Sequence, residues 1–78
     1  MVVLLTNNKN WKRDLGWEMK MARERKTLTI RELSQYAGVS QTTVTVNENG
    51  KRGYQLDTLV LLAEAMNCDL IMELRPRG

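Results

Sequence analysis

The sequence predicts a mainly α-helical domain of four short helices, with a strand-like segment near each end of the chain. Apolar residues recur at intervals of three and four through most of the 78 residues, as they do along amphipathic helices. Residues that commonly begin and end helices divide this pattern into four parts. A chain of this length forms one domain, residues 1–78, and buries roughly 60% of the surface that its unfolded form exposes.

The first predicted helix covers about residues 9–26. Its inward stripe repeats at helical spacing and consists of Trp11, Leu15, Met19 and Ala22. Trp17 and Met21 are four residues apart and lie on a different face. They either meet a second partner surface or remain as partly covered surface residues.

The second and third predicted helices are joined by a short turn that contains glycine. Thr29 and Glu32 have the spacing of a capping box, in which each side chain binds the other residue's backbone amide. Gly38 ends the second helix because glycine adopts positive φ at no steric cost. Ser40 is a good N-cap for the third helix, which is predicted at about 41–48. We therefore expect two short helices that cross closely at a sharp angle.

The fourth predicted helix, roughly 56–66, is apolar on nearly all sides, and we expect it to form the core of the domain. Asn67 follows it as a residue that can adopt the left-handed conformation found at helix ends.

Short apolar segments at about 2–5 and 70–75 are predicted to be β-strands, the second one stopped by Pro76. Two short strands leave open edges when they stand alone, so we expect them to pair across the two-fold axis of a dimer. The alternative is a disordered amino end and a tail strand packed within one chain. The expected dimer interface consists of Val3, Leu5, Trp17, Met21, Ile71 and Leu74.

The charge is unevenly distributed along the chain. Twelve Lys and Arg against nine Asp and Glu give a net charge of +3, but residues 9–31 hold eight basic and three acidic residues. Such a region associates with polyanions by releasing their counterions. The alternative is a charged helix face that is simply solvated.

The composition argues against an enzyme. The chain has no histidine and one cysteine, Cys68, so it lacks the commonest general base and cannot build a zinc site. It has no glycine-rich phosphate loop or nucleophile motif either, and we expect no cofactor and no metal. The opening residues are too short for a secretory signal, and nothing approaches a membrane-spanning run. A single thiol and no secretory pattern predict a cytoplasmic protein without a membrane partner.

The third helix has the side chains that base edges require. Short polar groups and methyl groups on its outer face can bind bases in the major groove if Val44 and Asn47 face inward. The predicted base-reading residues are Gln41, Thr42, Thr45 and Val46. The predicted phosphate-binding residues, at the helix starts and in the basic loop, are Thr29, Arg31, Ser40, Thr43, Lys51 and Arg52. Alternatively, Gln41 caps the helix or binds phosphate, and Lys51 and Arg52 are only solvated.

Several short motifs together resemble the lambda-repressor/Cro-like (XRE-like) helix-turn-helix DNA-binding family. They are LeuThr and GluLeu at 28–29 and 32–33, AlaGlyValSer at 37–40, ThrVal at 43–44, GluAsnGly at 48–50, and LeuAspThrLeu with LeuAlaGluAlaMet in 56–66. The likeness runs from Leu15 to about Asn67. It implies a compact four-helix domain that binds operator DNA as a dimer.

Three positions depart from the pattern of that family. Ile30 stands where Gln is common, Val46 where Arg or Lys is frequent, and Asn47 where a large aliphatic residue is usual. A buried Asn without partners costs about 1–3 kcal/mol. We therefore expect either that Asn47 is hydrogen-bonded or that the third helix is slightly rotated.

The sequence thus predicts a sequence-specific DNA-binding transcriptional regulator, a repressor that binds a palindromic operator as a dimer. Its expected partners are double-stranded DNA, which would make it nucleoid-associated, and a second copy of the chain. The alternative is an antitoxin-type module whose main task is to bind and neutralise a toxin protein. The Trp17/Met21 face and the terminal strands would serve that second function.

Overall fold

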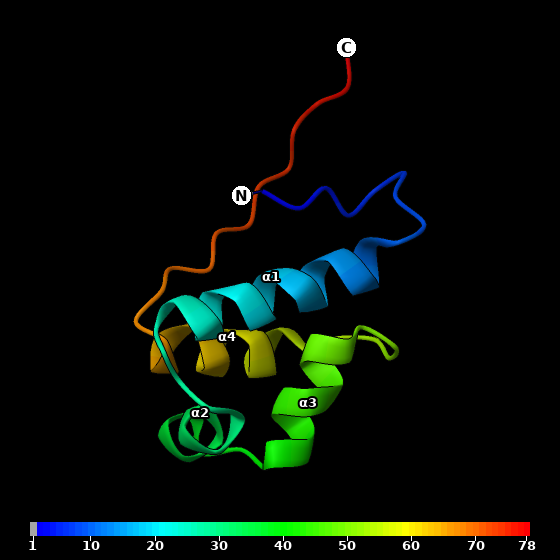
Figure 1. The fold of residues 1–78 in the computed structure, drawn as a ribbon. Helices are drawn as coiled ribbons and strands as arrows, with labels where there is room; N and C mark the ends of the chain where they lie inside the picture. Colours follow the sequence, from blue (N-terminus) through cyan, green and yellow to red (C-terminus); the bar gives the residue numbers. More distant parts are fainter. Residues whose placement is uncertain (1) are drawn as a thin grey trace.

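A computed structural model describes residues 2–78; Met1, part of the expected domain, lies outside the described residues. Residues 2–78 form four helices, which are α1 (Trp11–Arg25), α2 (Ile30–Ala37), α3 (Gln41–Asn49) and α4 (Leu56–Ala65). Figure 1 shows α2 and α3 on the same side of α1, while both chain ends extend on its other side. The predicted helices at 9–26, 41–48 and 56–66 are confirmed to within a residue or two.

Local capping interactions set the limits of the two central helices. Thr29 accepts a hydrogen bond from the Glu32 amide and completes the predicted capping box at the start of α2. Gly38 ends α2 with φ of 71°, and Ser40 caps α3 by accepting a hydrogen bond from the Thr43 amide. Gly50 ends α3 in the same left-handed conformation, with φ of 66°.

The core lies where α1, α2, α3 and α4 meet. Its buried apolar side chains are Met19, Leu33, Val44, Leu59, Leu62 and Met66. Each fully buried side chain of this size stabilises the fold by about 1.5–3 kcal/mol. The expectation that α4 forms the core holds for one side of the helix: Leu59, Leu62 and Ala63 are buried, whereas Leu56, Val60 and Leu61 are exposed.

The predicted strands at 2–5 and 70–75 are wrong for the single chain. Residues 2–78 contain no strand, and no backbone hydrogen bond joins these two segments. A strand forms only when a neighbouring edge accepts and donates its backbone hydrogen bonds, and one chain offers neither segment such an edge. The carboxyl-terminal segment extends away from the helices (Figure 1), and its Ile71 and Leu74 are exposed.

The amino-terminal segment instead turns toward α1. The Asn8 side-chain amide donates to the Leu4 carbonyl at 2.7 Å and to the Asp14 carboxylate at 3.0 Å. Val3 and Trp17 line a shallow hollow between this segment and α1. Within residues 2–78, no helix has both the length and the apolar character needed to cross a membrane.

Candidate nucleic-acid interface

The outer face of α3 presents short polar side chains. Val44 is fully buried and holds the helix against the core, whereas Gln41, Thr42 and Thr45 are exposed. Val46 is half-buried, so its side chain is less accessible than the other three. Three of the four residues predicted to read bases therefore share one open surface.

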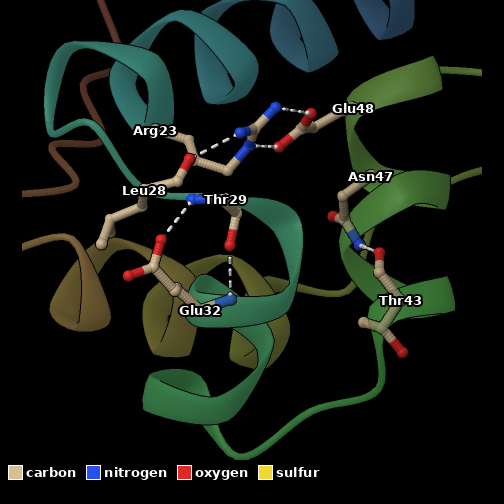
Figure 2. A network of polar contacts seen from close by, with 7 residues as sticks. All are labelled: Arg23, Leu28, Thr29, Glu32, Thr43, Asn47 and Glu48. Carbon is tan, nitrogen blue, oxygen red and sulfur yellow. Dashed lines mark hydrogen bonds and ion pairs between the residues drawn. The ribbon is translucent and has the colours of Figure 1, made fainter.

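A buried ion pair joins this helix to α1. The Arg23 guanidinium donates to the Glu48 carboxylate through Nε at 2.7 Å and through Nη2 at 3.1 Å. Its remaining Nη1 donates to the Leu28 carbonyl at 2.7 Å (Figure 2). The hydrogen bond to Glu48 raises the pKa of Arg23 above its ordinary value. The Arg23 side chain thus connects α1 with both α3 and the loop before α2.

Two glycines let α1 and the end of α3 approach closely. A Cβ on Gly16 would lie 2.6 Å from the Glu48 carbonyl oxygen and 2.8 Å from that of Asn47. A Cβ on Gly50 would lie 2.7 Å from the Arg13 Cα. These contacts are with backbone atoms, which cannot move aside as a flexible side chain can.

Asn47 is partly satisfied, which answers the question raised by its position. Its side-chain amide donates to the Thr43 carbonyl at 2.9 Å (Figure 2). Its Oδ1 is buried and has no partner within the described part of the chain. The expectation that Asn47 is hydrogen-bonded therefore holds for its side-chain nitrogen and not for its side-chain oxygen.

The loop after α3 is anchored near its base. The Tyr54 hydroxyl lies 2.8 Å from both the Lys12 and the Asn47 carbonyl oxygens, and its single proton serves either one. The Tyr54 ring also packs against Trp11, with ring centroids 6.0 Å apart, and burial raises the pKa of Tyr54. Lys51 and Arg52, the predicted phosphate-binding pair, are exposed just before this anchor.

The hydroxyl groups at the helix starts are already in use. Thr29 Oγ1 accepts from the Glu32 amide at 3.0 Å, and Ser40 Oγ accepts from the Thr43 amide at 3.0 Å. Ser40 Oγ and Thr43 Oγ1 also share a hydrogen bond of 2.9 Å. These caps also use the backbone amides of Thr29, Glu32 and Thr43, so a phosphate would have to meet the other first-turn amides of α2 and α3. Arg31 is exposed on α2.

The residues predicted to form a dimer interface do not gather on one surface of the single chain. Val3 and Trp17 share a hollow, and Met21 is half-buried on α1. Leu5 is exposed near the amino end, whereas Ile71 and Leu74 are exposed in the carboxyl-terminal tail.

Sequence reasoning missed the Arg23–Glu48 pair and counted Arg23 among the charges open to a polyanion. A signal was present, because Arg23 follows the inward Met19 by four residues and Glu48 follows the inward Val44 by four. Opposite charges at two inward positions indicate a buried pair rather than a solvated face.

Residues 19–71, more than half of the chain, match the helix-turn-helix family HTH_3, which is XRE/Cro-like. The chain belongs to this family. The comparison with curated proteins found no match. Membership implies that the protein binds DNA, and the family is not enzymatic. The resemblance inferred from the motifs is confirmed.

Proposed function

We propose that the protein is a transcriptional repressor that binds a palindromic operator as a dimer. The observation that carries this proposal is the exposed polar face of α3, held to the domain by the buried Arg23–Glu48 pair. Reading bases requires a helix that keeps its orientation when it enters the groove, since each base contact depends on hydrogen-bond geometry.

Base reading falls to the exposed side chains at the amino-terminal half of α3. Gln41 can bind adenine with both its donor and its acceptor, and Thr42 and Thr45 can meet polar base edges or the thymine methyl. Val46 offers only methyl contact from its half-buried position.

Phosphate binding falls to exposed cations and to helix amino ends. Lys51 and Arg52 flank the end of α3, and Arg31 lies in the first turn of α2. The first-turn amides of α2 and α3 add partial positive charge. The carboxylate of Glu32, engaged with the Thr29 amide at 2.9 Å, offsets part of this charge at α2.

The exposed apolar residues of the carboxyl-terminal tail support the proposal that the protein is a dimer. Leu70, Ile71, Met72 and Leu74 have exposed fractions of 40%, 83%, 74% and 95%. A second copy would cover them and supply the edge that a strand at 70–75 needs. In such a dimer the two α3 helices would enter successive major grooves about 34 Å apart.

Binding selection from a randomised duplex pool tests this function directly. We expect enrichment of a two-fold symmetric sequence whose half-sites are about one helical turn apart. Sedimentation should give a dimer, and a reporter behind the selected sequence should be switched down. Enrichment of a single unsymmetrical half-site would contradict dimeric operator binding.

A second candidate, an antitoxin-type module that neutralises a partner protein, is favoured by the apolar side chains left open on α4. Leu56, Val60 and Leu61 are exposed there and are separate from α3. If changing Val60 to Lys leaves both the dimer and DNA binding intact, that surface is free for a different protein.

A further inference from the structure

A hollow of about 370 Å³ lies between α1, the start of α2 and α3. Trp17 and Lys20 border it from α1, Ile30 from α2, and Thr45 and Asn49 from α3. The Arg23–Glu48 pair also lines it and bridges α1 and α3 (Figure 2). The hollow therefore adjoins the outer face of α3.

The charge of this hollow is positive. Arg23 and Glu48 neutralise each other through their paired hydrogen bonds, which leaves Lys20 as the other charged group in the lining. No carboxylate of residues 2–78 lies within ion-pair distance of Lys20. Its ammonium lies 5.9 Å from the centroid of the Trp17 ring, which is itself 53% exposed. A cation without an ion-pair partner can bind an anion, and the open aromatic ring beside it can cover an apolar group attached to that anion.

The width of the DNA major groove determines which part of the DNA would lie against this hollow. An α-helix with its side chains is about 10–12 Å wide, and the major groove is about 12 Å wide. A helix that fills the groove therefore has a sugar–phosphate backbone along each side. Thr45 belongs both to the exposed face of α3 and to the lining of the hollow, so the two surfaces are continuous.

We infer that this hollow receives the DNA backbone beside α3. Lys20 and the Asn49 side-chain amide bind a phosphate there, and the Trp17 ring covers the neighbouring deoxyribose. The inference rests on the proposed function and adds a backbone contact from α1. It also assigns Trp17 to the DNA surface, in place of the dimer interface predicted from the sequence.

Salt dependence of duplex binding tests the role of Lys20. We expect Lys20→Gln to weaken binding to every sequence. Because a dimer loses two such contacts, the slope of log affinity against log salt should fall by about 1.8. Between 50 and 200 mM salt, the wild type should consequently lose about 12-fold more affinity than the variant. Arg77→Gln removes the same charge from the exposed tail and should leave the slope unchanged.

Fluorescence tests the role of Trp17. Trp11→Phe leaves Trp17 as the only tryptophan, and we expect its emission to change on saturation with duplex DNA. Trp17→Ala should weaken binding while the protein remains as dimeric as the wild type by sedimentation. Unchanged Trp17 emission together with an unchanged slope for Lys20→Gln would overturn the inference, as would loss of the dimer in Trp17→Ala.

Different results would contradict DNA binding itself and the added contact from α1. If the wild type shows no salt-dependent duplex binding, the proposed function itself is wrong. If the wild type binds its selected operator while the Lys20→Gln slope and the Trp17 emission both stay unchanged, only the contact from α1 is wrong.

Discussion

The Arg23 guanidinium on α1 and the Glu48 carboxylate on α3 form a two-pronged hydrogen-bonded pair, with N–O distances of 2.7 and 3.1 Å. Both side chains are buried, with exposed fractions of 9% and 7%. The pair joins α1 to the carboxyl-terminal part of α3. It links the orientation of that helix to the stability of the domain.

Removal of one member of this pair should be strongly destabilising. Glu48→Gln leaves a buried guanidinium without its counter-charge, so we expect the free energy of unfolding to fall by about 3–5 kcal/mol. Urea unfolding measures this change in the free energy of unfolding. Glu64→Gln on the exposed side of α4 is the matched control and should change stability by less than about 0.5 kcal/mol. Equal effects of the two substitutions would contradict a structural role for the ion pair.

Gly16 should tolerate no side chain. Gly16→Ala places a methyl group against the backbone oxygens of Asn47 and Glu48, so α1 and α3 must move apart. We expect a loss of about 1–3 kcal/mol in unfolding free energy and weaker DNA binding. Gly53→Ala is the control, because a Cβ there meets no atom within 4 Å. A Gly16→Ala protein as stable as the Gly53→Ala protein would show that the close approach does not matter.

Asn47→Leu should stabilise the domain. The substitution removes a buried Oδ1 that has no partner, and the Thr43 carbonyl retains the hydrogen bond of the helix itself. Leaving such a group buried costs about 1–3 kcal/mol, so we expect unfolding free energy to rise by about 1 kcal/mol. Thermal and urea unfolding measure the change. A fall in stability would mean that the larger side chain does not fit.

Glu32 should make stability depend on pH in the acid range. Hydrogen bonds from the Thr29 amide and hydroxyl lower the pKa of Glu32 below its ordinary value of 4.5. The ionised form therefore stabilises the folded state above pH 4.5, and this contribution is lost as pH falls through the lower folded pKa. Glu32→Gln keeps an acceptor for the capping box but cannot titrate. We expect the stability difference between wild type and variant to be largest near pH 7 and to shrink toward pH 3. A difference that is constant with pH would rule out the ionised capping box.

Gln41→Ala should relax sequence preference at one base pair. The exposed side chain lies in the first turn of α3, and loss of a bidentate base contact costs about 1–3 kcal/mol of binding. Binding selection with the variant checks this result. Uniformly weaker binding with the same preferred sequence would indicate that Gln41 contacts the backbone instead.

The limits of the helices along the chain could be predicted from the sequence because they depend on local contacts. Thr29 with Glu32, Gly38, and Ser40 set the ends of α2 and α3 through contacts within four residues, which need no distant segment of the chain. The exposed Gln41, Thr42 and Thr45 follow from the same local register once Val44 faces inward. These features could therefore be predicted without a tertiary structure.

Only the tertiary structure decided how α1 meets α3. Arg23 and Glu48 are 25 residues apart, and Gly16 matters because the backbone of α3 approaches it. The segments at 2–5 and 70–75 have strand-like composition, yet the single chain forms no strand from them. Capping depends on near neighbours, whereas ion pairs, close helix approaches and strands depend on whichever distant segment lies opposite, and composition does not specify that segment.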